Sequence, residues 1–436
     1  MLGMKNIMYK KMIKNVSFIV LTILVFQLIS SVFLISDRRN YQWIRGFYEE
    51  NDRSLDVVLI GGSNIYAFWA APIAWNNYGI TSWTYTCNSM PLVAAEYCIR
   101  EAFPRHPNSI YVIGLNTFYH KPDSSMIHWM ADYMPFSKNK LEMINQLSKI
   151  GEINKWDTLE FYFPVIRFHS RWEELTKEDF DTDFEGIKGA SHYKAFLENV
   201  KDLSKGGNDD SEAELYDWIL DSVNRLLDYS KENNITLVFV TTPQFRTEQY
   251  TDNIGKLSDY ITQQGFPVVQ MFGKVDDVGL DASHDFYNAN HTNIHGAVKT
   301  TDYLAKYLIE NYGLEDKRGK AEYRDWDEAY KTYADLLSMY SLPFEYAENK
   351  RNYSLAIPKI KKKKGKLSWE AVDRSDGYGI FVKDSSDGWR LISCVDNSCL
   401  SWEDENYSKD RKYTVVAFTL KEDELLWGNL DISNNG

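Results

Sequence analysis

A serine and a histidine that lie far apart in the sequence could act together as a nucleophile and its base. Ser63 follows the apolar residues 55–60 and two glycines, and a helical pattern begins after it. Glycines permit a tight turn at the carboxyl end of a strand, where an open α/β sheet binds ligands. His291 follows the last expected strand, so its imidazole can reach this serine and take its proton. Taken alone, the two would be a helix N-cap serine and a structural histidine, and His284 and His295 are alternative bases.

Two further motifs could stabilise the negative charge that such a reaction creates. Asn116 follows the apolar residues 110–115, and its side-chain amide could donate to a developing oxyanion. Asn88 and Ser89 directly precede another helical pattern, so backbone amides of this turn could serve the same purpose. Each motif alone would also fit an ordinary turn.

Taken in chain order, these four motifs resemble the SGNH (GDSL-like) hydrolase superfamily. They read G-G-S-N at 61–64, C-N-S at 87–89, G-L-N at 114–116 and N-H-T-N at 290–293. More narrowly, they look like its membrane-anchored extracytoplasmic branch, whose members accompany membrane-bound O-acyltransferases and modify cell-envelope polymers. The resemblance covers about residues 54–312. It implies Ser63 as nucleophile, His291 as base, and Asn116 with Asn88 or Ser89 at the oxyanion.

One position departs from the family pattern. The superfamily has an acid three residues before the catalytic histidine, and this chain has Asn288 there. An amide can hold the imidazole of His291, but it cannot stabilise imidazolium as a carboxylate does, and it could select the wrong tautomer. Asp285, six residues before His291, could substitute from a neighbouring turn.

The elements between residues 50 and 312 predict an α/β domain. Short apolar runs at 55–60, 110–115, 236–240 and 267–271 alternate with helical patterns, which indicates a parallel sheet covered on both faces. Residues 137–208 interrupt this rhythm as a mostly helical insertion. The resemblance implies that the fold is the flavodoxin-like three-layer sheet of SGNH proteins. Residues 313–350 are predicted to form a helical linker.

A basic and aromatic fragment lies within the insertion. His169, Arg171 and Trp172 belong to the sequence F-P-V-I-R-F-H-S-R-W at 163–172. By the family resemblance, a similar sequence occurs in the anchored branch. Its predicted function is to grip a sugar ring or an anionic polymer near Ser63. The alternative is a packing segment of the insertion.

The N-terminal segment is long and apolar enough for a membrane span. Residues 15–36 carry no charge and would extend about 33 Å as a helix. We expect an uncleaved anchor after a cytoplasmic tail at 1–14, because the run is longer than the apolar region of a signal peptide. Basic residues flank both ends, so only the family resemblance favours an extracytoplasmic location for the rest of the chain.

Residues 353–431 show the short alternating strands of an all-β sandwich. They resemble a fibronectin type III module, with Trp369 in the core, Tyr378 on the third strand and Tyr413 as the corner tyrosine. Such modules bind or space other domains and rarely catalyse. The lysine-rich residues 358–366 just inside this module fit a solvated linker or strand edge, and their alternative is a contact with an anionic polymer or headgroups.

Composition excludes several other classes of function. The 436 residues carry 49 Lys and Arg against 62 Asp and Glu, and a net charge of −13 argues against non-specific nucleic-acid binding. The four cysteines are too few for a disulfide scaffold and show no metal-binding spacing, although local pairing stays open. No cofactor is expected, because serine chemistry needs none.

These observations predict a membrane-anchored serine enzyme that acts on acyl esters of an envelope polysaccharide or related polymer. Its acyl-serine would pass the acyl group to a sugar hydroxyl or to water, and a membrane-bound O-acyltransferase is the expected partner. Two alternatives stay open: a non-catalytic envelope-binding or scaffold protein, and a secreted hydrolase of lipids or small esters.

Overall fold

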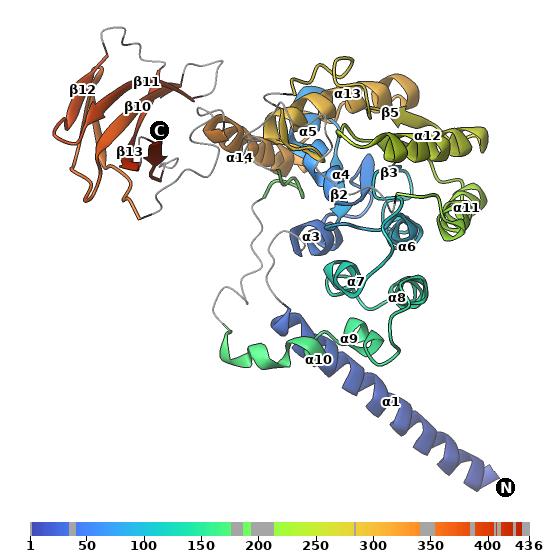
Figure 1. The fold of residues 1–436 in the computed structure, drawn as a ribbon. Helices are drawn as coiled ribbons and strands as arrows, with labels where there is room; N and C mark the ends of the chain where they lie inside the picture. The colour runs from blue at the N-terminus through green and yellow to red at the C-terminus, as the bar shows by residue number, and fades with distance from the viewer. Residues whose placement is uncertain are drawn as a thin grey trace.

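An N-terminal helix, an α/β domain and a C-terminal β-sandwich follow one another along the chain (Figure 1). The computed structural model describes residues 2–34, 41–175, 186–192, 213–282, 285–340, 354–383, 389–404, 407, 411–421 and 424–429. His284, one alternative base, lies outside these residues. Cys87 and Cys98 are buried free thiols, and the structure contains no disulfide among the four cysteines, all of which lie in its described residues.

The α/β domain contains a five-stranded parallel sheet. Its strands are β1 (Val57–Gly61), β2 (Ser82–Thr86), β3 (Ile110–Gly114), β4 (Leu237–Thr241) and β5 (Val268–Gln270), in the spatial order β2-β1-β3-β4-β5. Strands β1 to β4 are buried along their whole length. The predicted parallel sheet is confirmed. Its order reverses between β1 and β3, and the crevice at such a point is where doubly wound sheets bind ligands.

Strand β2 is the one strand of this sheet that the sequence analysis did not identify. Two of its polar residues are buried and hydrogen-bonded: Ser82 Oγ accepts from Trp69 Nε1 at 2.9 Å, and Thr84 Oγ1 donates to Gly189 O at 2.7 Å. A Cβ on Gly189 would come within 3.0 Å of the Trp83 ring, so residues 186–192 pack closely over this edge strand.

Helices cover both faces of the sheet (Figure 1). One face carries α4 (Ser63–Phe68), α5 (Ala71–Tyr78) and α13 (Ile294–Tyr312). The other carries α6 (Ala95–Ala102), α11 (Asp217–Glu232) and α12 (Glu248–Gln263), and Tyr260 Oη donates to Asn224 Oδ1 at 2.6 Å between the last two. The chain moves in one direction along the sheet from β1 to β2 and in the other direction from β2 to β3, β4 and β5. Because each crossover is right-handed, the two directions place their helices on opposite faces.

The described residues between β3 and β4 are mostly helical. They form α7 (Ser124–Ala131), α8 (Lys138–Ile150), α9 (Thr158–Tyr162), α10 (Val165–Phe168) and the 3-10 helix η3 (His169–Glu173). Other short turns are η2 (Leu92–Ala94), η6 (Ala321–Tyr323), the π-helix η1 (Tyr41–Arg45) and α3 (Gly46–Glu49).

The first helix, α1 (Leu2–Phe33), contains a segment that is long and apolar enough to cross a membrane. This segment is Tyr9–Ser30, 22 residues, and most of its side chains are exposed, although its last residues contact the protein. A signal sequence near an N-terminus can meet the same criteria of length and hydropathy.

The C-terminal strands form two antiparallel sheets. One is β11 (Trp389–Asp396), β10 (Gly377–Lys383), β13 (Lys412–Lys421) and β14 (Glu424–Trp427); the other is β12 (Ser401–Glu403), β9 (Lys366–Trp369) and β8 (Ile360–Lys363). Trp369 and Tyr378 pack in the core with ring centroids 5.4 Å apart. Strand β8 is an edge, so its lysines protect an open strand against pairing with other chains.

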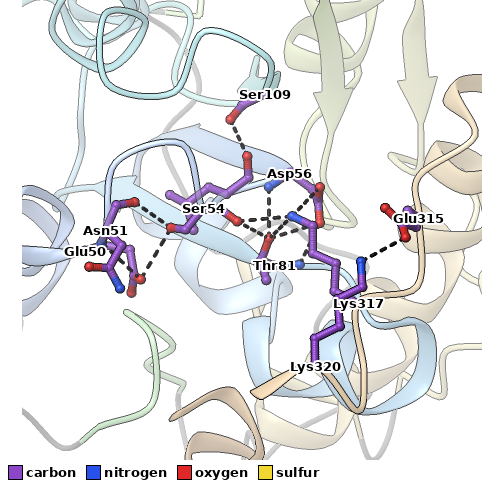
Figure 2. Close-up of polar contacts among 10 residues, drawn as sticks. Glu50, Asn51, Ser54, Asp56, Thr81, Ser109, Glu315, Lys317 and Lys320 are labelled. Atoms are coloured by element: carbon purple, nitrogen blue, oxygen red, sulfur yellow. Dashed lines mark hydrogen bonds and ion pairs between the residues drawn. The ribbon is translucent and has the colours of Figure 1, made fainter. Parts of the chain in front are cut away.

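A polar network at the amino ends of the sheet strands fastens the segment after α13 (Figure 2). The ammonium of Lys317 lies 2.7 Å from Asp56 Oδ1, and it donates to Ser54 O at 3.1 Å and to Thr81 Oγ1 at 3.0 Å. Thr81 in turn donates its backbone N–H and its hydroxyl to Asp56 Oδ2. The network ties the linker to the start of β1, opposite the edge that carries Ser63.

Replacing Lys317 with methionine is expected to lower the free energy of unfolding by about 1–3 kcal/mol, because it leaves the carboxylate of Asp56 partly buried without its cation. The two side chains are only 13% and 14% exposed. Lys306→Met is the matched control, since its pair with Asp302 on α13 is 59% and 34% exposed and should contribute under about 0.5 kcal/mol. Urea unfolding of both variants measures the difference, and equal losses would contradict this assignment.

Candidate active site

Ser63 is the first residue of α4, directly after β1 and Gly62. A Cβ on Gly62 would come within 2.7 Å of Thr117 Cγ2 and 3.4 Å of Met90 N, so a larger residue would force these segments apart. The glycine therefore lets the serine turn approach the turns that follow β2 and β3. Thr117 Oγ1 donates to Met90 O at 2.7 Å and holds those two turns together.

His291 reaches Ser63 because its hairpin and α13 are fastened to α4. Strands β6 (Phe286–Asn288) and β7 (His291–Thr292) form the hairpin, and Thr292 Oγ1 donates to Ala67 O at 2.6 Å. The side chain of Asn293 caps α13, because its Oδ1 accepts from the backbone N–H groups of His295 and Gly296 at 3.0 and 3.1 Å. As a result, Ser63 Oγ and His291 Nε2 lie 2.8 Å apart, across 228 positions of sequence.

The side chain of Asn288 sets the tautomer of His291. Its Oδ1 accepts from the backbone N–H of Asn290 at 2.9 Å and lies 2.9 Å from His291 Nδ1. A flipped amide would place its NH2 group against the Asn290 N–H, donor to donor, so Oδ1 must face both groups. Nδ1 therefore carries the proton, and Nε2 presents its lone pair to the Ser63 hydroxyl.

Asp285 is buried and pairs with α13. Its Oδ2 lies 2.6 Å from Lys299 Nζ and accepts from Asp281 N at 2.7 Å, while its carbonyl oxygen accepts from Asn293 N at 2.9 Å. These contacts fix the start of the hairpin. Asn288, three residues before His291, is therefore the side chain that contacts Nδ1 of the imidazole, while the carboxylate of Asp285 pairs with Lys299.

The three expected oxyanion residues differ in their contacts and backbone conformation. Asn116 is 3% exposed and pairs with the backbone of Thr242, donating from Nδ2 to its carbonyl at 3.1 Å and accepting its N–H on Oδ1 at 2.7 Å. This pairing joins the ends of β3 and β4. Asn88 Oδ1 accepts from Tyr66 Oη at 2.8 Å, and Ser89 adopts a left-handed backbone with φ of 49°. The backbone of this turn lies beside the serine turn, since a Cβ on Gly62 would lie 3.4 Å from Met90 N.

Arg246 is a candidate site residue that the sequence analysis missed. Its guanidinium donates to Asn290 Oδ1 at 2.8 Å and to Tyr119 Oη at 2.6 Å, and it stacks 4.4 Å from the centroid of Tyr250. Burial, together with the positive charge of Arg246, lowers the pKa of His291 from 6.5 to about 4. The imidazole is therefore neutral at pH 7. The sequence could have indicated Arg246, because it follows the carboxyl end of β4 and the carboxyl ends of parallel strands lie at the same edge of the sheet as Ser63.

Further buried hydrogen bonds hold the site together, and they involve Gln244, Thr242 and Asn64. Gln244 Nε2 donates to Asn290 O at 2.9 Å, and Asn64 Nδ2 donates to Thr242 Oγ1 at 3.2 Å. These contacts connect the loop after β4 both to the histidine hairpin and to the serine turn. Among the residues that the structure describes, no group of three or more His, Cys, Asp and Glu side chains is placed to hold a metal ion.

The basic and aromatic fragment lies away from Ser63, in contrast to our expectation. Arg171 donates to the carbonyl oxygens of Phe33 and Leu34 at the end of α1, at 2.8 and 2.6 Å. His169 Nδ1 lies 2.8 Å from Ile166 O within its own turn, and Trp172 is exposed. Figure 1 shows α10 beside α1, with α7 between it and the sheet. The expected position near Ser63 came from the residue types and the family resemblance, whereas the insertion extends toward α1.

Comparison with known proteins finds no family model that matches the chain and no curated protein that matches it significantly.

Proposed function

We propose that this protein is a serine acyl-ester enzyme of SGNH (GDSL-like) type. The observation that carries the proposal is the relay from Ser63 Oγ to His291 Nε2, 2.8 Å apart, and from His291 Nδ1 to Asn288 Oδ1, at 2.9 Å. Nucleophile and base within hydrogen-bond reach, with the base oriented by a third group, is the arrangement that activates a serine. The strand order and the position of Ser63 after β1 also support an SGNH-like fold.

The chemistry follows from this geometry. Ser63 Oγ attacks the acyl carbonyl carbon, and its proton passes to His291 Nε2. Backbone amides at the start of α4 and in the Asn88 turn are the candidate donors to the oxyanion. His291 then returns the proton to the departing alkoxide, which leaves an acyl-serine. A second hydroxyl, from a sugar or from water, gives its proton to His291 and attacks the acyl-serine. His291 returns that proton to Ser63 Oγ as the ester bond breaks, which restores both side chains.

The substrate we propose is an O-acylated envelope polysaccharide or related polymer, with α1 as a membrane anchor and the rest of the chain extracytoplasmic. The candidate membrane span Tyr9–Ser30 of α1 and the motif resemblance support this assignment. A fibronectin type III-like role for the β-sandwich, in binding or spacing, is part of the same proposal. A membrane-bound O-acyltransferase is the proposed source of acyl groups where the reaction is a transfer.

A second candidate function is binding without catalysis. Asn288 carries no charge, and Arg246 places a positive charge near His291, so the imidazolium of the transition state is poorly stabilised. A non-catalytic scaffold would use the site only to bind a ligand and would not need Ser63 to be activated.

The test that separates the two functions is covalent trapping. The purified full chain in detergent is exposed briefly to an activated acyl ester, and the Ser63 peptide is examined by mass spectrometry. We expect an adduct of the acyl mass, absent in Ser63→Ala and strongly reduced in His291→Ala. Absence of any adduct in a chain whose fold is intact by circular dichroism would favour binding over catalysis.

A further inference from the structure

A segment of the insertion is attached to the end of α1 where its apolar stretch stops. We name residues 155–172, which include α9, α10 and part of η3, the collar. Gln27 Nε2 donates to Tyr162 O at 3.0 Å, Val165 N donates to Ser30 Oγ at 3.3 Å, and the rings of Phe26 and Phe163 lie 6.0 Å apart. The collar is therefore fixed to the last two turns of α1 by both polar and aromatic contacts.

Arg171 completes this attachment by capping α1. The last carbonyl groups of a helix have no partner within the helix and carry partial negative charge. The Arg171 guanidinium donates to two of them, on Phe33 and Leu34. In a bilayer interface such carbonyls need protein or water partners, and the collar supplies one.

The attachment also fixes the depth of the collar. Phe26 lies seven residues before Phe33, the last residue of α1, which corresponds to about 10 Å along the helix. The apolar segment extends to Ser30, so the contacts of Phe26 and Gln27 lie within it. If α1 crosses a membrane, Tyr162 and Phe163 cannot lie above the headgroup layer.

The outer surface of the collar carries large apolar side chains. Trp156 is 77% exposed and Trp172 is 64% exposed, and Leu159 and Ile166 are also exposed. Tryptophan is enriched at membrane interfaces, where its ring suits the headgroup level. Within the collar, the three positive charges of Lys155, Arg167 and Arg171 are largely offset by Asp157 and Glu160, which leaves a net charge of +1. The aromatic side chains, rather than net charge, are therefore the feature that suits a lipid surface.

We propose that the collar lies in the headgroup layer of the membrane that α1 enters, with Trp156 and Trp172 inserted among the lipids. This inference rests on α1 as a membrane anchor and not on the chemistry of Ser63. A single helix followed by a flexible chain would let the α/β domain rotate freely. The collar instead holds the domain against the membrane surface, so the polymer it meets must lie close to the bilayer.

The test uses the full chain in phosphatidylcholine vesicles without other proteins. Cys394 and Cys399 are replaced by serine, and the buried Cys87 and Cys98 are kept. Single cysteines are then introduced by Trp156→Cys or Trp172→Cys and carry a nitroxide label. The depth of each label is measured from the rates at which the nitroxide collides with two reagents. Dissolved oxygen concentrates in lipid, whereas a nickel chelate stays in water. Leu420→Cys is the matched control, since Leu420 on β13 is 56% exposed and lies in the β-sandwich.

We expect the labels at 156 and 172 to be at least about threefold less accessible to nickel than the label at 420. Equal accessibility at the three positions would overturn the proposal and leave the exposed tryptophans for a protein partner. A label introduced by Val20→Cys reports the anchor separately. If that label is also open to nickel, α1 does not span the bilayer and the proposal fails with it, whereas acyl trapping on Ser63 is unaffected by either result.

Discussion

Turnover of an activated acyl ester is expected to fall by about 10³- to 10⁶-fold when Ser63 is replaced by alanine. The substitution removes the nucleophile and leaves His291 without the hydroxyl that it deprotonates. Because the N-cap of α4 is Gly62 and the hydroxyl of Ser63 bonds to His291 rather than to the helix, the fold should persist. Initial rates on a p-nitrophenyl ester measure the effect, and Ser125→Ala, at an exposed serine on α7, is the control expected to retain full activity.

The same experiment with His291→Ala distinguishes a relay from two independent contributions. Groups that act as one unit show strongly non-additive losses, so the double variant should be no slower than Ser63→Ala alone, within about twofold. If the two losses instead multiply, Ser63 and His291 do not act on the same step. A rate unchanged by Ser63→Ala would remove the serine from the mechanism altogether.

The main parts of this site were predictable because they depend on topology. Parallel strands present their carboxyl ends at one edge, so a serine after the first strand and a histidine before the last helix were expected to meet there. The 2.8 Å contact between Ser63 and His291 agrees with that geometric expectation. Strand β2 was not identified, because Ser82 and Thr84 look solvent-facing in sequence but are buried through hydrogen bonds with Trp69 and Gly189.

Other features depend on contacts that a sequence pattern does not report. The orientation of the Asn288 amide depends on the backbone N–H of Asn290, a donor that every residue but proline carries. The side chain of Asn116 pairs with the backbone of Thr242, although its place after β3 suggested a donor for substrate. Arg171 carries the charge expected of a polymer-binding residue, yet its partners are the last carbonyls of α1.

Asn288→Asp is expected to increase turnover by about 10- to 10³-fold. In serine proteases, replacing the orienting aspartate by asparagine costs about 10⁴-fold, and part of that loss comes from the wrong tautomer. Here the tautomer is already correct, because Asn290 N–H holds Oδ1 toward His291, so the gain comes mainly from charge. A carboxylate of the same shape would keep both hydrogen bonds and stabilise the imidazolium that forms as Ser63 attacks.

The pH profile shows whether charge is the cause. Burial and Arg246 hold the pKa of His291 at about 4, so the rate should fall on the acid side only near pH 4. An adjacent carboxylate favours the protonated imidazole, so Asn288→Asp should move this acid limb upward by about 1–3 pH units. Asn108→Asp, at an exposed asparagine before β3, adds the same charge at the opposite edge of the sheet and should change neither quantity. A faster variant with an unmoved limb would mean that the substitution acts on packing, and a slower one would mean that the neutral amide is the group this site requires.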